Sequence, residues 1–319
     1  MPYKKKIILL GSAAAALALV YGLTLFFDPA RVNTRNAYFT WLPAGAREEA
    51  DRIEIFRGQE KLELVLRNGQ WAALLAAPGE FPGAGESSPV MEVPVKQGRV
   101  DDLFRILETR GAFPRRGSSP ENHADLGLTD NAARLVIRGG AGLPLLDLLV
   151  GRDDASGKEV FLRRNGENVF RSGNRLIGSY VNGQRSSWYD LRLFEEVSLD
   201  LVQKVQVNFT GAEGVENFGI VRSGENWNFE GGAPILDREN LENWIRGILE
   251  AQGEDFRIPV NFNPRARISL ELGNGSVLLL QIGETEEDKS PGLVSGKPYL
   301  FVLPQWTVSR LLRDQNYFR

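Results

Sequence analysis

The same series of elements occurs twice in this chain, and the repetition limits the folds it can adopt. Alternating apolar residues predict a strand at Ile53-Glu54-Ile55 and another at Val205-Gln206-Val207. In each series a glycine turn, a strand bearing a tryptophan, an amphipathic helix and several short strands follow in the same order. Two copies are too few for a solenoid of short repeats. The sequence therefore predicts two similar α+β lobes, each with antiparallel β-sheet and one main amphipathic helix.

Matched residues extend through both copies, and they set the expected boundaries at 51–195 for the first repeat and 196–319 for the second. The shortening of the second copy falls mostly in loops, where deletions are tolerated. The matched pairs are Trp71 with Trp227, Val100 with Leu241, Ala133–Ile137 with Ala266–Leu270, Gly151 with Gly283, Gly157-Lys158 with Gly296-Lys297, and the closing Asp190-x-x-x-Phe194 with Asp314-x-x-x-Phe318.

An uncharged segment of 21 residues, from Ile7 to Phe27, precedes the repeats. As a helix it would span roughly 30 Å, about one hydrocarbon thickness. Signal-peptide cores are shorter, about 7–15 residues, so an uncleaved anchor at 1–27 is favoured and a cleaved signal is the alternative. Lys4–Lys6 should stay in the cytoplasm, which places the connecting segment 28–50 and both repeats outside it. The anchor residues expected in the bilayer include Ile7, Leu10, Leu17, Val20, Leu25 and Phe27.

Composition excludes several kinds of site. The chain has no cysteine, which excludes disulfides, zinc–thiolate centres and cysteine nucleophiles. The formal net charge is −3 even with Lys4–Lys6 included, so we expect no nucleic-acid partner. His123 is the single histidine and lies in a loop without a nucleophile motif, which predicts an ordinary surface residue. We expect no catalytic residue, no metal and no cofactor.

Two acidic runs and two tryptophans leave alternatives open. Glu284–Asp288 and its counterpart Asp153-Asp154 could serve a hydrolase or bind calcium, but their common position predicts a solvated hairpin turn. Exposed aromatics such as Trp41 or Trp188 could instead make the protein an envelope glycan-binding module.

The two copies differ most in two loops of the first repeat, predicted at Ala77–Val95 and Arg110–Asp130. Loops tolerate variation and often carry binding residues. The candidate interaction residues in these loops are Phe81, Val90, Arg115, Arg116 and His123.

The whole pattern resembles the bacterial family known as domain of unknown function 4340. The features that carry the resemblance are the Lys-rich start with one apolar helix, Ile53-x-Ile55, Leu62-x-Leu64-x-Leu66, Asn68-Gly69-Gln70-Trp71, the Val100–Leu107 helix, Leu126-Gly127-Leu128 before the Ala133–Ile137 strand, and the Asp190–Phe194 closure. The long insertion Ala77–Val95 departs from the family pattern.

This resemblance implies an extracytoplasmic accessory protein of the bacterial inner membrane. Members of the family look like companions of ABC transporters similar to those linked to gliding motility. The implied partners are transporter permease and ATPase subunits or other envelope proteins, together with the lipid bilayer. The family supplies no catalytic residue, so we expect a non-enzymatic subunit.

Overall fold

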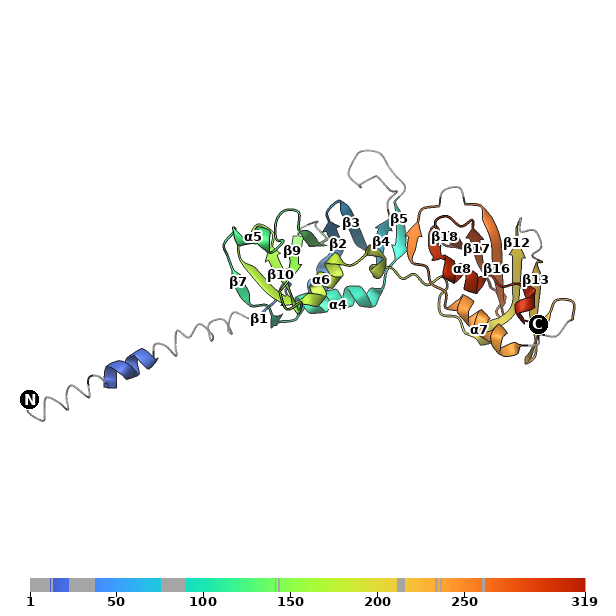
Figure 1. Ribbon diagram of the computed structural model, residues 1–319, viewed down its shortest axis with the longest axis horizontal. Coiled ribbons are helices and arrows are strands. Elements are labelled where there is room, and N and C mark those ends of the chain that lie inside the picture. The colour runs from blue at the N-terminus through green and yellow to red at the C-terminus, as the bar shows by residue number, and fades with distance from the viewer. Residues whose placement is uncertain are drawn as a thin grey trace, which may run out of the picture. The chain divides into compact units, whose positions relative to one another are not determined.

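The computed structural model describes Ser12 and residues 14–22, 38–75, 90–140, 142, 144–210, 216–232, 235, 237–259 and 262–318 (Figure 1). Contacts divide the chain into two compact units, Met1–Leu66 with Gly98–Gly183 and Arg67–Gln97 with Gln184–Arg319. Both contain mostly antiparallel β-sheet and few helices, which confirms the expected α+β class. The boundary expected between residues 195 and 196 stays a prediction.

Residues 14–22 of the predicted anchor are helical, and Leu17 and Val20 on this stretch are exposed. The other anchor residues named above, Ile7, Leu10, Leu25 and Phe27, lie outside the described residues. Within the described part of the chain, no helix is both long and apolar enough to cross a membrane.

The first sheet has nine strands in the order β5-β4-β3-β2-β8-β9-β10-β11-β7. Helix α4 (Gln97–Glu108) buries one apolar stripe, and α6 (Arg175–Asn182) packs on β2, β8, β9 and β10. A short pair, β1 (Tyr38–Phe39) with β6 (Gly111–Ala112), and helix α3 (Ala46–Glu49) lie outside this sheet. The nine strands are β2 (Ala50–Arg57), β3 (Glu60–Arg67), β4 (Gln70–Leu75), β5 (Met91–Pro94), β7 (Arg115–Gly117), β8 (Ala133–Gly139), β9 (Pro144–Asp153), β10 (Glu159–Arg164) and β11 (Phe170–Asn174).

The second sheet has eight strands in the order β14-β13-β12-β16-β17-β18-β19-β15. This order repeats that of the first sheet, in which β5 is the extra strand. Helices α7 (Arg238–Leu249) and α8 (Gln305–Leu311) take the places of α4 and α6 in the chain order. The strands are β12 (Val202–Phe209), β13 (Phe218–Ser223), β14 (Asn226–Phe229), β15 (Asp255–Arg257), β16 (Pro264–Leu272), β17 (Val277–Gly283), β18 (Lys289–Val294) and β19 (Leu300–Pro304).

Strand register confirms several of the sequence matches. Ile53 lies opposite Ile137, and Val205 lies opposite Leu270, so the opening strands are equivalent residue by residue. The register of β8 with β9 agrees with that of β16 with β17, which makes Gly151 equivalent to Gly283. A Cβ atom on either glycine would crowd the segment that leads into the neighbouring strand.

Two other matches are wrong. Gly157 lies in the turn between β9 and β10, whereas Gly296 lies one hairpin later, between β18 and β19, where its counterpart is Gly166. The 3-10 helix η1 (Arg185–Trp188) follows α6, as η3 (Gln315–Phe318) follows α8. Trp188 therefore corresponds to Phe318, and the Asp-x-x-x-Phe closure of the first copy falls beyond this element.

Both segments expected as loops contain regular structure. Residues 91–94 of the first form strand β5 and pair with β4, and residues 76–89 lie outside the described part of the chain. The second contains β6, β7 and the short helix α5 (Asn122–Asp125). Few apolar residues mark these elements, which explains why their sequence looked like loop.

Candidate binding site

The candidate interaction residues of the first repeat differ in their exposure to solvent. Phe81 lies outside the described residues, while Val90, Arg115 and Arg116 are exposed. Arg116 is engaged, because its guanidinium donates to the Ser172 hydroxyl and pairs with a carboxylate.

His123 is buried, with only 8% of its surface exposed. Its Nε2 lies 3.0 Å from the carbonyl oxygen of Asn168, and its ring meets Phe170 edge to face at 5.8 Å. The expectation of a surface histidine is therefore wrong, and this side chain is not presented to a partner.

Trp41 and Trp188 are both buried in the core, so neither indole can stack on a glycan. Trp41 packs edge to face against Phe39 and Phe113 instead. These residues enter the core because aromatic pairs contribute more than their buried area alone.

The acidic runs behave as hairpin turns. Every residue of Glu284–Asp288 is exposed, so the converging carboxylates that a hydrolase needs are not formed there. Asp154 accepts hydrogen bonds from the Ser156 hydroxyl and from backbone N–H groups of its own turn, which lowers the pKa of its carboxyl to about 2. Among the described residues, no group of three or more histidine, aspartate or glutamate side chains could hold a metal ion.

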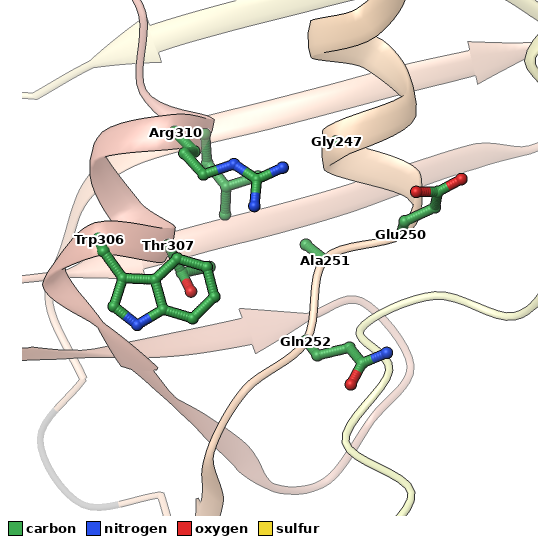
Figure 2. A pocket seen from close by; sticks show the side chains of 8 residues that line it. Gly247, Glu250, Ala251, Gln252, Trp306, Thr307 and Arg310 are labelled. Atoms are coloured by element: carbon green, nitrogen blue, oxygen red, sulfur yellow. The ribbon is translucent and has the colours of Figure 1, made fainter.

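A hollow of about 220 Å³ opens in the second unit beside α7 and α8 (Figure 2). We call it the Trp306 hollow. Trp306, Thr307 and Arg310 come from α8, and Gly247 and Glu250 come from α7 and its end. The lining residues are Gly247, Glu250, Ala251, Gln252, Trp306, Thr307, Arg310 and Leu311.

Local sequence fixes the two helices that form this hollow. Helix α7 begins at the cap Asp237, whose carboxylate accepts from the backbone N–H of Asn240 at 2.9 Å. Helix α8 follows Pro304, a residue that suits a helix start because it lacks an N–H to satisfy. The buried Trp244 indole of α7 then donates to the carbonyl oxygen of Leu311 at 3.0 Å. This hydrogen bond links the end of α8 to α7 at Leu311, one of the residues that line the hollow.

Trp306 is far more exposed than the other tryptophans of this chain. It is 62% exposed, whereas the other five tryptophans are 1–6% exposed. The Arg310 guanidinium lies 6.0 Å from its ring centroid and reaches toward Gly247 (Figure 2). A cation over an indole face is attracted by the ring's quadrupole, which helps to orient both side chains.

Thr307 lies next to this indole and is only 4% exposed. Its hydroxyl makes no hydrogen bond to any residue that the structure describes. Such a group typically costs about 1–3 kcal/mol of stability. Thr307 lines the hollow, but its hydroxyl oxygen is covered and does not open onto it.

The first unit has apolar residues at the two matched helix positions. Ile177, the third residue of α6, corresponds to Thr307, the third residue of α8. Ile106, the tenth residue of α4, corresponds to Gly247, the tenth of α7. The nearest atom to a Cβ built on Gly247 would be Arg310 Nη2 at 3.6 Å, an ordinary contact. Close packing therefore does not require a glycine at position 247. The missing side chain leaves space that belongs to the hollow.

Of the residues that line the hollow, the sequence singles out only Leu311, which with Val308 and Leu312 predicts a short last helix. Val308 and Leu311 are buried in the structure. The available signal was the difference between copies at matched helix positions, an isoleucine in one and a threonine or glycine in the other.

No protein-family model matches the chain, and none of the curated proteins or solved structures compared with it is detectably similar. The resemblance to family 4340 therefore stays a prediction.

Proposed function

We propose that this protein is a non-enzymatic, membrane-anchored accessory subunit of an ABC-type export or envelope complex. Its α+β units would bind a substrate or partner subunits outside the cytoplasm of a bacterial cell. The observation that carries the binding role is the Trp306 hollow. An exposed indole beside a hollow lined by Glu250, Gln252 and Arg310 forms a surface that suits a bound molecule.

The repeated strand order supports this proposal. We infer a duplicated fold, because the two sheets agree in strand order and in register at their opening strands. A duplicated framework allows one copy to stay structural while the other diverges. Here the copies differ at Gly247 and Thr307, and both residues line the Trp306 hollow of the second copy.

The anchor and the kind of complex rest on the sequence. Lys4–Lys6 followed by the uncharged Ile7–Phe27 segment favours a single span with the bulk of the chain outside. The association with an ABC transporter rests on the family resemblance, which names permease and ATPase subunits as partners.

Crosslinking in native membranes tests the proposal. The full chain should stay in the membrane fraction after alkaline washing, and added protease should reach residues beyond 28 only from outside the cytoplasmic membrane. After gentle solubilisation, mass spectrometry should identify a transporter permease or ATPase crosslinked to it. Recovery as a lone monomer without crosslinked transporter subunits would overturn the association.

A further inference from the structure

We propose that the Trp306 hollow binds one pyranose ring of a glycan, with a C–H face of the sugar stacked on the Trp306 indole. The inference rests on the binding role proposed above and names the class of ligand. It is independent of the association with a transporter.

The size of the hollow suits one sugar ring. A cavity of about 150 Å³ is large enough for benzene, so about 220 Å³ accommodates a six-membered ring with substituents. Sites for drug-sized ligands usually measure about 300–1,000 Å³. A nucleotide or an extended peptide would therefore project out of the hollow, while one terminal or internal sugar unit fits.

The indole provides the apolar surface. A pyranose presents axial C–H groups on its faces and hydroxyls around its edge, so it pairs with a flat apolar ring surrounded by polar groups. Trp306 offers such a ring in a largely exposed position, and tryptophan contributes large contact area at a low cost in conformational entropy. Arg310 restrains the indole from one side.

The polar groups around the hollow match the sugar's edge. Among the lining residues, the Glu250 carboxylate can accept hydrogen bonds, the Arg310 guanidinium can donate them, and the Gln252 amide can do both.

The charges favour a neutral ligand. The hollow is lined by one cation, Arg310, and one anion, Glu250, which leaves no net charge. Phosphate and carboxylate sites usually converge several cationic or N–H donors on the anion. A neutral sugar is therefore a better fit than a phosphorylated group or an acidic peptide.

Fluorescence quenching tests the proposal directly, because Trp306 is the exposed tryptophan among six. The full chain in detergent is titrated with a panel of glycans ending in hexose, N-acetylhexosamine, deoxyhexose and uronic acid units. At least one should protect Trp306 from acrylamide and reduce the quenching constant. In calorimetry with that glycan, Trp306→Ala should weaken binding at least tenfold, which corresponds to about 1.4 kcal/mol.

Two further variants separate the hollow from general effects on folding. Gly247→Leu fills the hollow and should abolish binding, while circular dichroism confirms that the chain is folded. Leu176→Ala removes the exposed residue at the matching position of α6 and should leave binding unchanged.

Protection by none of the glycans, or equal binding by Gly247→Leu, would overturn the inference. Loss of a protein crosslink in Trp306→Ala, without any glycan binding, would show that the hollow docks a protein. That outcome would refute the sugar site and support the proposed accessory role. Glycan binding by a protein that crosslinks to no transporter subunit would support the sugar site and refute the proposed accessory role.

Discussion

Replacement of Lys61 by methionine should destabilise the first unit strongly. Lys61 Nζ lies 2.7 Å from Glu54 Oε1 and 2.7 Å from Glu63 Oε2. The two glutamates face each other across the β2–β3 ladder, and each is only 6% exposed. One ammonium group therefore bridges two buried carboxylates, and its loss increases their mutual repulsion.

The magnitude follows from what remains after the substitution. Removal of one partner from a buried ion pair typically costs about 3–5 kcal/mol. Glu54 keeps Arg138 Nε at 2.7 Å, and Glu63 keeps Arg52 Nη1 at 2.8 Å, but both guanidinium groups are partly exposed and give weaker compensation. We therefore expect a loss near the lower end of this range, about 3 kcal/mol at pH 7.

The stability loss in Lys61→Met should depend on pH, and its direction follows from the pKa of Glu54. Burial alone would raise the pKa of Glu54, but hydrogen bonds from Lys61 and Arg138 outweigh it and leave the pKa lowered. A lowered pKa contributes stability above the unfolded value, and the contribution is lost as pH falls through the folded value. In Lys61→Met the Glu54 carboxylate loses one of the hydrogen bonds that lower its pKa, so it should take up a proton more readily than in the parent protein. The penalty should therefore shrink below about pH 5.

Hydrogen exchange of the β2 and β3 amides measures this loss at the affected strands and does not require the whole chain to unfold in one transition. Lys204→Met is the matched control on β12 of the second unit. The side chain of its partner Glu230 is 43% exposed, so the control should lose less than about 1 kcal/mol. A loss below 1 kcal/mol in Lys61→Met at pH 7, or an equal loss at pH 4, would refute the reasoning.

Three further outcomes are expected. Gly151→Ala should cost about 3 kcal/mol in urea unfolding, because its Cβ would lie 2.3 Å from the backbone oxygen of Leu126; a loss below 1 kcal/mol would argue against this contact. NMR titration should place the pKa of Asp154 at about 2, since the serine hydroxyl and backbone N–H groups of its turn stabilise the carboxylate; its contribution to stability disappears as pH falls toward 2, and a pKa near 4 would contradict the geometry. Thr307→Val should stabilise the second unit by about 1 kcal/mol and Gly247→Ala by a similar amount, and a loss of stability in both would show that the hollow is required for packing.

The repeat could be predicted because strand periodicity and register constrain each other. Alternation with a period of two places Ile53 and Ile55 on one face, and a slip by one residue would expose both. The same argument applies to Val205 and Val207. The structure confirms these assignments because each of the four side chains is buried, which fixes the pairing of the central strands.

Turn residues were less reliable than strand periodicity for matching the two copies. Gly157-Lys158 and Gly296-Lys297 share the same dipeptide, and both glycines adopt positive φ. Such a conformation is required in many tight turns, so it does not identify the hairpin in which a glycine lies. The match consequently slipped by one hairpin. Strand order distinguishes the two turns, and strand order depends on contacts between distant parts of the chain.

The burial of His123 and Trp188 could not be deduced from local sequence. His123 lies among polar and small residues, and the residues that immediately precede Trp188 are polar or glycine. Their burial depends on contacts that only the folded chain creates, such as the carbonyl of Asn168 beside the imidazole. Short elements of two to four residues carry too few side chains to show a period of 2 or 3.6.

The Trp306 hollow has features that are difficult to explain by packing alone. Glycine inside a helix is about 1 kcal/mol less favourable than alanine, and a buried hydroxyl without a partner costs about 1–3 kcal/mol. The first unit shows that the same topology accepts isoleucine at both matched positions, so the fold does not impose either residue. Proteins commonly give up stability where a site must stay open for a ligand. The exchange of Ile177 for Thr307 and of Ile106 for Gly247 is therefore what the proposal of a binding site in the second unit predicts, while the first unit has apolar residues at both positions.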